Sequence, residues 1–342
     1  MKVLIVNNMA PFVWGGAEEL ATHLKRNLLA HGHTADVLRI PFQWQPVPKI
    51  PTQMLLVRGI ELENVDRVIG LQFPAYLIRH PQKTLWVLHQ YRQAYDLYDA
   101  GHTDLEEVDG LRALIKSADE ETFAECRQIF TNSEVTRRRL SHYNSVEAQV
   151  LMPPVNDPEL FYEAPAEGYI FAGGRVNNMK RQRLLLEAFA MTTGRAKLVI
   201  AGPAEDESYA ADLRTTIDRM GIADRVTLDI RFLPRGVYAD YVRKASAVAY
   251  VPFDEDSLGY VAMEGVTARK PLLTTADSGG VLGLARDRET GWVAAPTAAA
   301  LAEAMTSVFE DPARARTYGQ AANELWRSMD ISWPDTVSRL LR

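Results

Sequence analysis

Short apolar runs alternate with helix-length segments along almost the whole of this 342-residue chain. Each run has the length of a buried strand, and strands separated by helices are typical of parallel βαβ units. The expected strands of the first half are residues 3–6, 35–40, 68–71, 85–88, 128–130 and 149–151, and those of the second half are residues 169–172, 198–201, 226–228, 247–251, 272–274 and 292–294. The pattern predicts an α/β chain with two doubly wound, Rossmann-like domains, which hold ligands outside the carboxyl ends of their strands.

The alternation stops between residues 152 and 168, where four prolines follow at short intervals: Pro153, Pro154, Pro158 and Pro165. Because proline restricts φ, we expect a stiff, extended connection here. This places one domain at residues 1–160 and a second at residues 166–329. Residues 330–342 are too few to form a stable isolated helix, and we expect them to pack back on the first domain.

Two helices of the first domain are clear from their apolar spacing. The first ends at Gly32 and has an apolar face made of Ala17, Leu20, Ala21, Leu24 and Leu28. The second covers residues 111–127. Residues 41–51, by contrast, contain four prolines and no periodicity, which predicts an irregular loop over the sheet.

The formal net charge of −6 argues against nucleic acid as the main partner. Arg137, Arg138 and Arg139 form the one basic cluster, which is either a solvated helix face or a landing patch for an anionic membrane or acceptor. Cys126 is the only cysteine, so there is no intrachain disulfide and a reducing compartment fits. No apolar run has the length of a membrane span, and residues 3–6 are too short for the core of a signal peptide. We expect a cytoplasmic protein whose membrane contact, if any, is peripheral to the inner face.

An apolar strand, two glycines and then cations follow one another around residue 175. Gly173 and Gly174 allow the backbone to turn and to approach a ligand closely. Arg175 and Lys180 place positive charge beside the amides of a helix start, an arrangement that suits a diphosphate. The alternative is a plain strand-to-helix turn with solvated surface cations.

A second stretch, residues 251–265, passes from a strand through acidic residues to a helix. Gly259 near the helix start would offer backbone amides as a second anion cradle. Asp256 and Glu264 lie eight residues apart, and ionised carboxylates accept hydrogen bonds from sugar or ribose hydroxyls. The alternatives are a helix cap for Asp256 and a helix surface charge for Glu264.

The order of these motifs resembles the family 4 retaining glycosyltransferases of GT-B fold. The resemblance rests on Gly174-Arg175-Val176, Lys180-Arg181, the segments 184–189 and 198–202, the acid-to-glutamate stretch and Lys270-Pro271-Leu272. It implies two Rossmann-like domains that face each other across a cleft, the first on the acceptor side and the second binding the nucleotide sugar. It also implies transfer of a hexose-like sugar from a UDP- or GDP-sugar, with retention at the anomeric carbon and with neither metal nor other cofactor. The implied acceptor is a hydroxyl of a glycan, a lipid-linked or a small molecule, as in polysaccharide or other glycoconjugate synthesis.

The resemblance also assigns roles to individual residues. Arg175 and Lys180 would hold the donor diphosphate, and Glu264 would bind the nucleotide ribose. Further donor-binding positions that the motifs imply are Gly15, Gly16, Gly174, Leu258, Gly259 and Tyr260. His89, which follows the strand 85–88, matches a histidine that contacts the donor sugar in that family; a strand-end histidine bonded to backbone is the simpler interpretation.

The sequence departs from the family at the first acid of its E-x7-E pattern. Asp256 stands at that position and Glu255 precedes it, so either carboxylate is a candidate for the sugar. The resulting Asp254-x-Asp256 also resembles the metal motif of another glycosyltransferase fold. Because Arg175 and Lys180 already compensate the diphosphate charge, we expect no metal. The expected catalytic residues are His89, Arg175, Lys180 and Asp256.

Two other classes of protein stay open at this point. A sugar-nucleotide epimerase or hydrolase of the same architecture would turn over the nucleotide sugar without an acceptor. A non-catalytic sensor would bind the nucleotide sugar without turnover. A dinucleotide oxidoreductase is disfavoured because residues 6–16 lack the G-x-G-x-x-G motif after the first strand.

Overall fold

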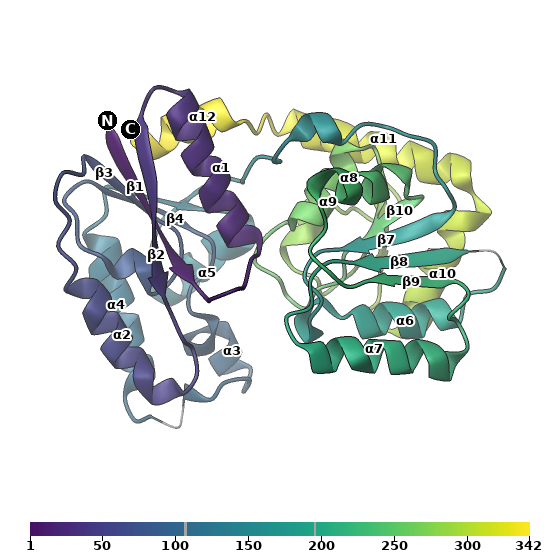
Figure 1. Ribbon diagram of the computed structural model, residues 1–342, viewed down its shortest axis with the longest axis horizontal. Coiled ribbons are helices and arrows are strands. Elements are labelled where there is room, and N and C mark those ends of the chain that lie inside the picture. Colours follow the sequence, from purple (N-terminus) through teal and green to yellow (C-terminus); the bar gives the residue numbers. More distant parts are fainter. Residues whose placement is uncertain (106–107, 195) are drawn as a thin grey trace. The chain divides into compact units, whose positions relative to one another are not determined.

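The computed structural model describes residues 1–105, 108–194 and 196–342. The chain forms two compact units, Met1–Pro154 together with Ile331–Arg342, and Val155–Asp330 (Figure 1). Each unit contains a six-stranded sheet whose paired strands run parallel. The twelve expected strands are all present, which confirms the predicted α/β class.

The first sheet has the strand order β2-β1-β3-β4-β5-β6. Its strands are β1 (Lys2–Met9), β2 (Thr34–Pro41), β3 (Arg67–Gly70), β4 (Lys83–Val87), β5 (Gln128–Thr131) and β6 (Gln149–Val150). One face packs against α1 (Gly16–Ala30) and α12 (Trp333–Leu341), and the other against α2 (Ile50–Arg58) and α4 (Leu111–Ala124). Two further helices of this unit are α3 (Asp96–Asp99) and α5 (Glu134–Asn144).

Strand residues of the first sheet alternate between its two faces, as successive side chains of a strand must. Val3 and Ile5 of β1 belong to the apolar cluster under α1, and Val337 and Leu340 of α12 complete this cluster. The buried side chains of α1 are Leu20, Ala21, Leu24 and Leu28, which lie on the expected face. The chain leaves the helix through Gly32, whose φ of +79° favours glycine.

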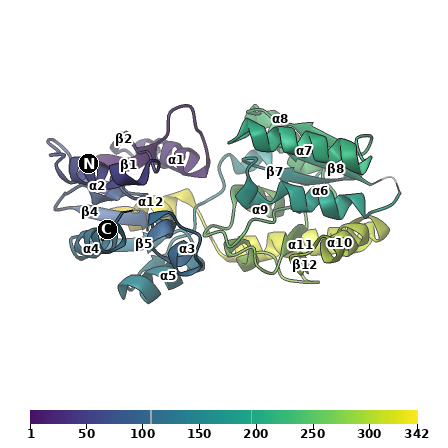
Figure 2. The same ribbon diagram turned by 90° about the horizontal axis from the view of Figure 1, so that it is seen from below.

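The second sheet has the strand order β12-β11-β10-β7-β8-β9. Its strands are β7 (Tyr169–Gly173), β8 (Lys197–Ala201), β9 (Val226–Asp229), β10 (Ala247–Ala249), β11 (Leu272–Thr275) and β12 (Gly291–Ala294). Helices α6 (Gln182–Ala190), α7 (Glu207–Met220) and α10 (Ala298–Glu310) share one apolar cluster on one face. Helices α8 (Arg235–Lys244), α9 (Tyr260–Thr267) and α11 (Pro312–Ser328) lie on the other face (Figures 1 and 2).

The strand order of the second sheet reverses between β7 and β10, which pair although they are far apart in the sequence. In a doubly wound sheet the connections on either side of such a reversal diverge, and ligands bind there outside the carboxyl ends of the strands. The segments that follow these two strands are residues 173–181 and 251–259. The topology therefore brings the glycine-cation turn and the acidic stretch to one place.

The connection between the units packs with the second unit from Val155 onward, including residues 155–160, which the sequence placed with the first domain. Arg235 of α8 gives the physical reason. Its Nη2 donates a 2.9 Å hydrogen bond to Asn156 O, and its guanidinium lies over the Phe161 ring at 4.7 Å. The prolines of this segment therefore do not prevent it from packing on the second unit.

The prediction of an irregular loop over residues 41–51 is wrong for part of that segment. Strand β2 extends to Pro41, a 3-10 turn covers Val47–Lys49, and α2 begins at Ile50. Pro51 lies in the first turn of α2. Proline is tolerated there because the first N–H groups of a helix have no acceptor within the helix.

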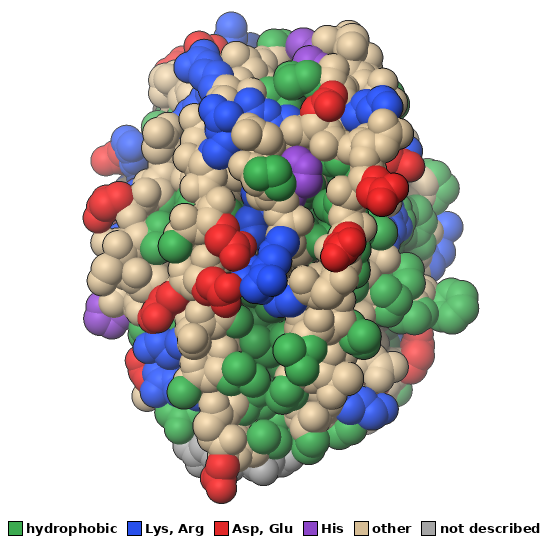
Figure 3. All heavy atoms as spheres, turned by 90° about the vertical axis from the view of Figure 1, so that its left-hand side faces the viewer, with side chains coloured by type: hydrophobic (Ala, Val, Ile, Leu, Met, Phe, Trp, Pro, Cys, Tyr) green, Lys and Arg blue, Asp and Glu red, His purple; other side chains and the backbone are tan. Residues whose placement is uncertain are grey.

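The surface of the first unit mixes charges of both signs. Figure 3 shows a face on which basic side chains lie beside acidic ones and hydrophobic side chains gather in the lower half. Arg58 of α2, for example, donates to Glu121 of α4 and to Glu125, the C-cap of that helix, and Leu55 and Leu56 of α2 are exposed. Among the residues that the structure describes, none of the helices combines the length and the apolar character of a membrane span.

A buried hydrogen-bond network lies behind the loop that follows β4. Asp119 of α4 is fully buried and accepts hydrogen bonds of 2.8 Å from the hydroxyls of Tyr76 and Tyr95. The Tyr95 hydroxyl accepts a 3.3 Å bond from Asn144 Nδ2, and Asn144 Oδ1 accepts one from Gln90 in that loop. Burial raises the pKa of the Asp119 carboxyl to about 7, although the two tyrosine hydroxyls oppose this rise.

We expect Asp119→Asn to change how the stability of the protein depends on pH. The folded protein keeps the Asp119 proton up to about pH 7, whereas the unfolded chain loses it near 3.8, so the folded state binds more protons between these values. Relative to the variant, the wild type should lose about 1 to 4 kcal/mol of unfolding free energy between about pH 4 and pH 8. Urea unfolding at several pH values measures this difference.

The control is Glu303→Gln, which removes an exposed carboxyl from α10, away from Asp119. Its pH profile should follow that of the wild type. Parallel profiles for the wild type and Asp119→Asn would show that burial does not raise the pKa of the Asp119 carboxyl in the folded protein.

Candidate functional site

Three glycines bring the turn after β7 against the end of β8. Gly174 has a φ of +108° and Gly202 a φ of +142°, values that side chains disfavour. A Cβ on Gly202 would lie 2.1 Å from Gly174 O, and one on Gly173 would lie 2.8 Å from the Tyr238 hydroxyl. A Cβ on Gly174 would meet no atom of the described residues within 4 Å. The turn is therefore tightly packed on one side and open on the other.

Lys180 closes a short 3-10 turn, Asn178–Lys180, that separates the glycines from α6. The Asn177 side chain caps this turn by accepting a 3.0 Å hydrogen bond from Lys180 N. The Lys180 ammonium donates to the Tyr250 hydroxyl at 2.9 Å and to Glu255 Oε2 at 2.6 Å. Lys180 thus joins the turn after β7 to the end of β10 and to the acidic loop, across the reversal of strand order.

The surroundings of Lys180 keep its ammonium charged. Burial alone would lower the pKa of Lys180, but Tyr250 and Glu255 outweigh burial and raise it above its ordinary value. Burial raises the pKa of Tyr250 to about 12, so this hydroxyl stays neutral. An ammonium has three N–H donors, so the two bonds found among the described residues leave one donor for a ligand.

Arg175 pairs with a different acid. Its Nη1 lies 3.4 Å from Glu205 Oε2, which also accepts a 2.6 Å hydrogen bond from Asn177 Nδ2. The Arg175 side chain is 35% exposed. Because exposed ion pairs contribute little to stability, the guanidinium is able to exchange Glu205 for another anion.

The acidic loop after β10 places its two candidate carboxylates in different surroundings. Glu255 is partly exposed and pairs with Lys180, whereas Asp256 is buried. The loop lies against residues 278–280, since Glu255 N donates to Ser278 O at 3.2 Å and Gly280 N donates to Glu255 O at 2.7 Å. A Cβ on Gly280 would lie 2.6 Å from Asp256 O, so this close approach requires glycine. Which of the two carboxylates meets a sugar stays a prediction.

Helix α9 begins where the sequence predicted a helix start. Gly259 is its N-cap with a φ of +79°, and a Cβ there would lie 2.3 Å from the Tyr250 ring. Leu258 is buried, and Tyr260 is the first helical residue. The alternative of Asp256 as the cap is therefore wrong. The first amides of α9 lack acceptors within the helix and carry its positive dipole end.

Glu264 is a buried ion-pair partner, so its interpretation as a helix surface charge is wrong. The residue is 2% exposed because α9 packs between β10 and α11. Its Oε1 lies 2.6 Å from Arg235 Nη1, and it also hydrogen-bonds the Tyr238 side chain. A role toward a ribose stays a prediction, and a ribose would have to share this carboxylate with Arg235.

The segment that contains Gly15 and Gly16, two of the expected donor-binding positions, leads into α1. Gly15 is the N-cap, and its amide donates a 2.9 Å hydrogen bond to Glu18 Oε2, while Gly16 is the first helical residue. Phe12 at the tip of the loop has a φ of +65° and is fully exposed. An approach of Gly15 and Gly16 to a phosphate stays a prediction.

His89 follows β4 and is hydrogen-bonded at both ring nitrogens. Its Nδ1 lies 2.7 Å from Gln90 O, and its Nε2 lies 3.1 Å from Gln72 Nε2. A carbonyl only accepts and an amide nitrogen only donates, so in this arrangement Nδ1 donates and Nε2 accepts. The bond to backbone agrees with the simpler interpretation of this histidine, and contact with a sugar stays a prediction.

The three arginines of α5 each lie near an acid. Arg137 and Arg138 are 2.6 Å and 4.0 Å from Glu134, and Arg139 is 3.2 Å from Asp96. Charges that are paired in this way attract an anionic surface less strongly than unpaired ones. The geometry thus favours a solvated helix face over a membrane patch.

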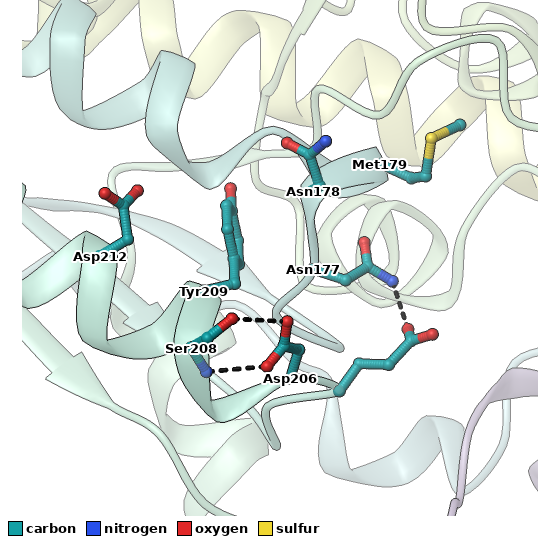
Figure 4. A pocket seen from close by; sticks show the side chains of 8 residues that line it. Asn177, Asn178, Met179, Asp206, Ser208, Tyr209 and Asp212 are labelled. Carbon is teal, nitrogen blue, oxygen red and sulfur yellow. Dashed lines mark hydrogen bonds between the residues drawn. The ribbon is translucent and has the colours of Figure 1, made fainter. Parts of the chain in front are cut away.

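A hollow opens between the glycine-cation turn and α7 (Figure 4). It is lined by Asn177, Asn178, Met179, Glu205, Asp206, Ser208, Tyr209 and Asp212. Asp206 caps α7 by accepting a 2.8 Å hydrogen bond from Ser208 N. Because three of the lining side chains are carboxylates, this hollow disfavours a phosphate. The better place for a diphosphate is the other side of the turn, at Lys180.

Sequence reasoning missed three residues that shape the site. Tyr250 lies near the carboxyl end of the expected strand 247–251, where doubly wound sheets bind ligands, and this position was a usable signal. Glu205 and Arg235 lie after β8 and at the start of α8, and no motif or spacing marks them. Their contacts join residues that are 30 and 29 positions apart.

Comparison with known proteins links the second unit to a glycosyltransferase family. Residues 163–325 match the family model described as Glycosyl transferases group 1. The D-inositol 3-phosphate glycosyltransferase of Kribbella flavida is 31% identical over 177 residues, which are 49% of this chain and 41% of that protein. The chain thus spans less than half the length of this curated relative.

Solved structures are similar to nearly the whole chain. Sucrose-phosphate synthase from Thermosynechococcus elongatus has a TM-score of 0.78 at 18% identity, with 99% of this chain and 97% of that chain covered. Anabaena HepE in complex with UDP-glucose has a TM-score of 0.74 at 15% identity, with 99% and 98% covered. At such identities the likeness concerns the fold alone, which is the GT-B fold.

We expect Glu264→Gln to destabilise the protein, because it replaces the buried carboxylate that pairs with Arg235 at 2.6 Å and leaves the guanidinium with the more distant Asp157 carboxylate at 3.7 Å. The free energy of unfolding should fall by about 1 to 3 kcal/mol, as for other buried charged pairs that lose one member. The control is Glu187→Gln, which affects an exposed pair with Arg183 and should change stability by less than about 0.5 kcal/mol. Urea unfolding compares the two variants, and equal, small effects would contradict the buried pair.

Proposed function

We propose that this chain is a glycosyltransferase that moves a sugar from a nucleotide diphosphate to an acceptor hydroxyl. The proposal rests on the position of Lys180, whose ammonium is held between Tyr250 and Glu255 at the reversal of strand order. A fixed cation with one donor to spare, beside a glycine turn, suits a diphosphate that gains negative charge as the sugar leaves. The match of residues 163–325 to Glycosyl transferases group 1 supports the same function.

In this proposal the rate comes mainly from charges that are in place before the bond breaks. Lys180 stabilises the negative charge that develops on the leaving diphosphate. Arg175 adds a second cation by exchanging its 3.4 Å contact with Glu205 for a phosphate oxygen. The amides at the start of α9, next to Gly259, add the positive end of a helix dipole. Such groups need no reorganisation during the reaction, which is why they accelerate it.

In this proposal, different carboxylates of the site bind the sugar and the ribose. Glu255 already faces Lys180, so a bound diphosphate would share the ammonium with it. Asp256 keeps the eight-residue offset from Glu264 and is our choice for the sugar hydroxyls, with Glu255 as the alternative. Glu264 takes the ribose in this proposal, because an ionised carboxylate accepts several hydrogen bonds and has capacity beyond Arg235. His89 would add a contact with the sugar.

The finer points of the proposal follow the family resemblance. The enzyme would belong to family 4, retain the anomeric configuration and need no metal. It would use a UDP- or GDP-sugar and act on a glycan, lipid-linked or small-molecule acceptor at the cytoplasmic side. Because a similar structure was solved with UDP-glucose and a relative is named for inositol 3-phosphate, these are the first donor and acceptor to assay.

We expect Lys180→Ala to lower the rate of sugar transfer by about 10²- to 10³-fold, the scale for removal of one preorganised charge-stabilising group. Donors are first selected by thermal shift from a panel of nucleotide sugars, and transfer is then measured with purified protein. The matched control is Lys197→Ala, which removes an exposed lysine at the start of β8 and should transfer at the normal rate.

The same assay separates the other classes. Sugar released or epimerised without an acceptor would indicate a hydrolase or epimerase, and binding without turnover would indicate a sensor. Excess EDTA should leave transfer unchanged, because Arg175 and Lys180 compensate the diphosphate charge. A well-folded Lys180→Ala protein that transfers normally would rule out the diphosphate role of Lys180.

A further inference from the structure

Arg181, the residue after Lys180, holds an unusual conformation for an arginine. Its φ is +53°, in the left-handed region that side chains disfavour. Its side chain is only 18% exposed. Such a backbone persists at a residue with a side chain where the surrounding contacts hold it in place, and the Arg181 side chain makes several such contacts.

The guanidinium of Arg181 reaches the chain that leaves β10. Its Nε donates to Val251 O at 2.7 Å, and its Nη2 lies 2.7 Å from Pro252 O. Both carbonyls stand at the root of the acidic loop that carries Glu255. Arg181 therefore fixes the point from which this loop departs.

The same guanidinium also binds the chain that leaves β11. Its Nη1 and Nη2 lie 2.8 Å from the two oxygens of Asp277, which is a bidentate pair, and Nη2 lies 2.7 Å from Thr275 Oγ1. Burial would raise the pKa of Asp277, but the hydrogen bonds and the charge of Arg181 lower it below its ordinary value, so the pair stays ionised. One side chain thus joins the segments that follow three neighbouring strands, β7, β10 and β11.

Backbone hydrogen bonds continue the same connection. Phe253 N donates to Met179 O at 2.9 Å, which ties the acidic loop to the turn of Lys180. Asp254 N donates to Asp277 O at 2.8 Å, which ties it to the loop after β11. The distance between the Lys180 ammonium and the Glu255 carboxylate therefore depends on segments that meet at Arg181.

Arg181 has little capacity to act as a ligand itself. A guanidinium has five N–H groups, and the bonds to Val251, Pro252, Thr275 and Asp277 engage four of them. Lysine would not replace it, because a single ammonium lacks the planar fork that binds a carboxylate and two carbonyls at once.

We propose that Arg181 is a positioning residue, which holds the Lys180 ammonium and the Glu255 carboxylate at the separation that the diphosphate site requires. This inference rests on the function proposed above. The inference adds that part of the transfer rate depends on a side chain that touches neither donor nor acceptor. Arg181 acts through Lys180, so a change of Lys180 tests the inference.

The central test is a double-mutant cycle with Lys180. Arg181→Gly removes the side chain and suits the left-handed backbone, so it isolates the effect of the guanidinium. We expect this variant to lower the transfer rate by about 10- to 10²-fold, the scale for misplacement of a catalytic group by about 1 Å. In the Lys180→Ala background the same change should cost less than about threefold, because the group that it positions is gone. A full, additive loss in both backgrounds would overturn the inference.

A second measurement needs no activity and so separates this inference from the proposed function. Acetylation of Lys180 by trace acetic anhydride, followed by mass spectrometry of the unliganded protein, reports how firmly Glu255 and Tyr250 hold the ammonium. In Arg181→Gly we expect Lys180 to react several-fold faster, with the exposed Lys197 as the internal reference. If the wild type transfers no sugar but this change appears, the proposed function fails and the positioning role of Arg181 stands.

Two variants serve as controls for folding and for charge. Arg183→Ala removes a neighbouring arginine that pairs with Glu187 and Asp212 on the surface, and it should change neither rate nor labelling. Asp277→Asn keeps the shape of the Asp277 side chain and removes its charge, so it should change the transfer rate and the Lys180 labelling as Arg181→Gly does, but more weakly. It takes the place of Arg181→Gly in the test if that variant does not fold. Unchanged Lys180 labelling in both folded Arg181→Gly and Asp277→Asn would overturn the positioning role.

Discussion

The site depends on the reversal of strand order between β7 and β10 in the second sheet. This reversal sets the glycine turn that follows β7 beside the acidic loop that follows β10, although 70 residues separate Lys180 from Tyr250. Neither segment would form a site alone. The turn supplies an ammonium and open backbone, and the loop supplies carboxylates and the start of α9. Glycines allow the close packing around both segments: a Cβ on Gly202 would collide with the turn at Gly174, one on Gly259 with the Tyr250 ring, and one on Gly280 with the acidic loop.

Charge in the site is balanced before any ligand binds. Lys180 is paired with Glu255 and Arg175 with Glu205. In the proposed function, a diphosphate would share Lys180 with Glu255 and would displace Glu205 from Arg175. The Arg175 pair is long and partly exposed, and it is the one that breaks easily. The Lys180 pair is short and is supported by Tyr250, Arg181 and the backbone around it. Lys180 is therefore held in one position, whereas Arg175 is able to change its partner.

The sequence allowed the elements to be predicted because buried strands, glycine turns and helix starts carry local signals. All twelve strands and the N-cap Gly259 came from such signals. Helix α2 was missed because Pro51 in its first turn, with Pro46 and Pro48 just before it, is typical of a loop. Glu264 was misjudged for a different reason: its burial follows from the packing of α9 between β10 and α11, which no spacing of its own helix reveals. The partners Arg235, Glu205 and Asp277 depend in the same way on contacts between distant segments.

The central claim is that Lys180 binds the diphosphate of a nucleotide. Calorimetric titration of UDP, GDP and their nucleosides into the wild type and into Lys180→Ala tests it most directly, since it needs neither the right sugar nor the right acceptor. We predict that one diphosphate binds the wild type at least about tenfold more tightly than its nucleoside, and that most of this advantage, about 1.4 kcal/mol or more, is lost in Lys180→Ala. An equal advantage of the diphosphate in both proteins would contradict it.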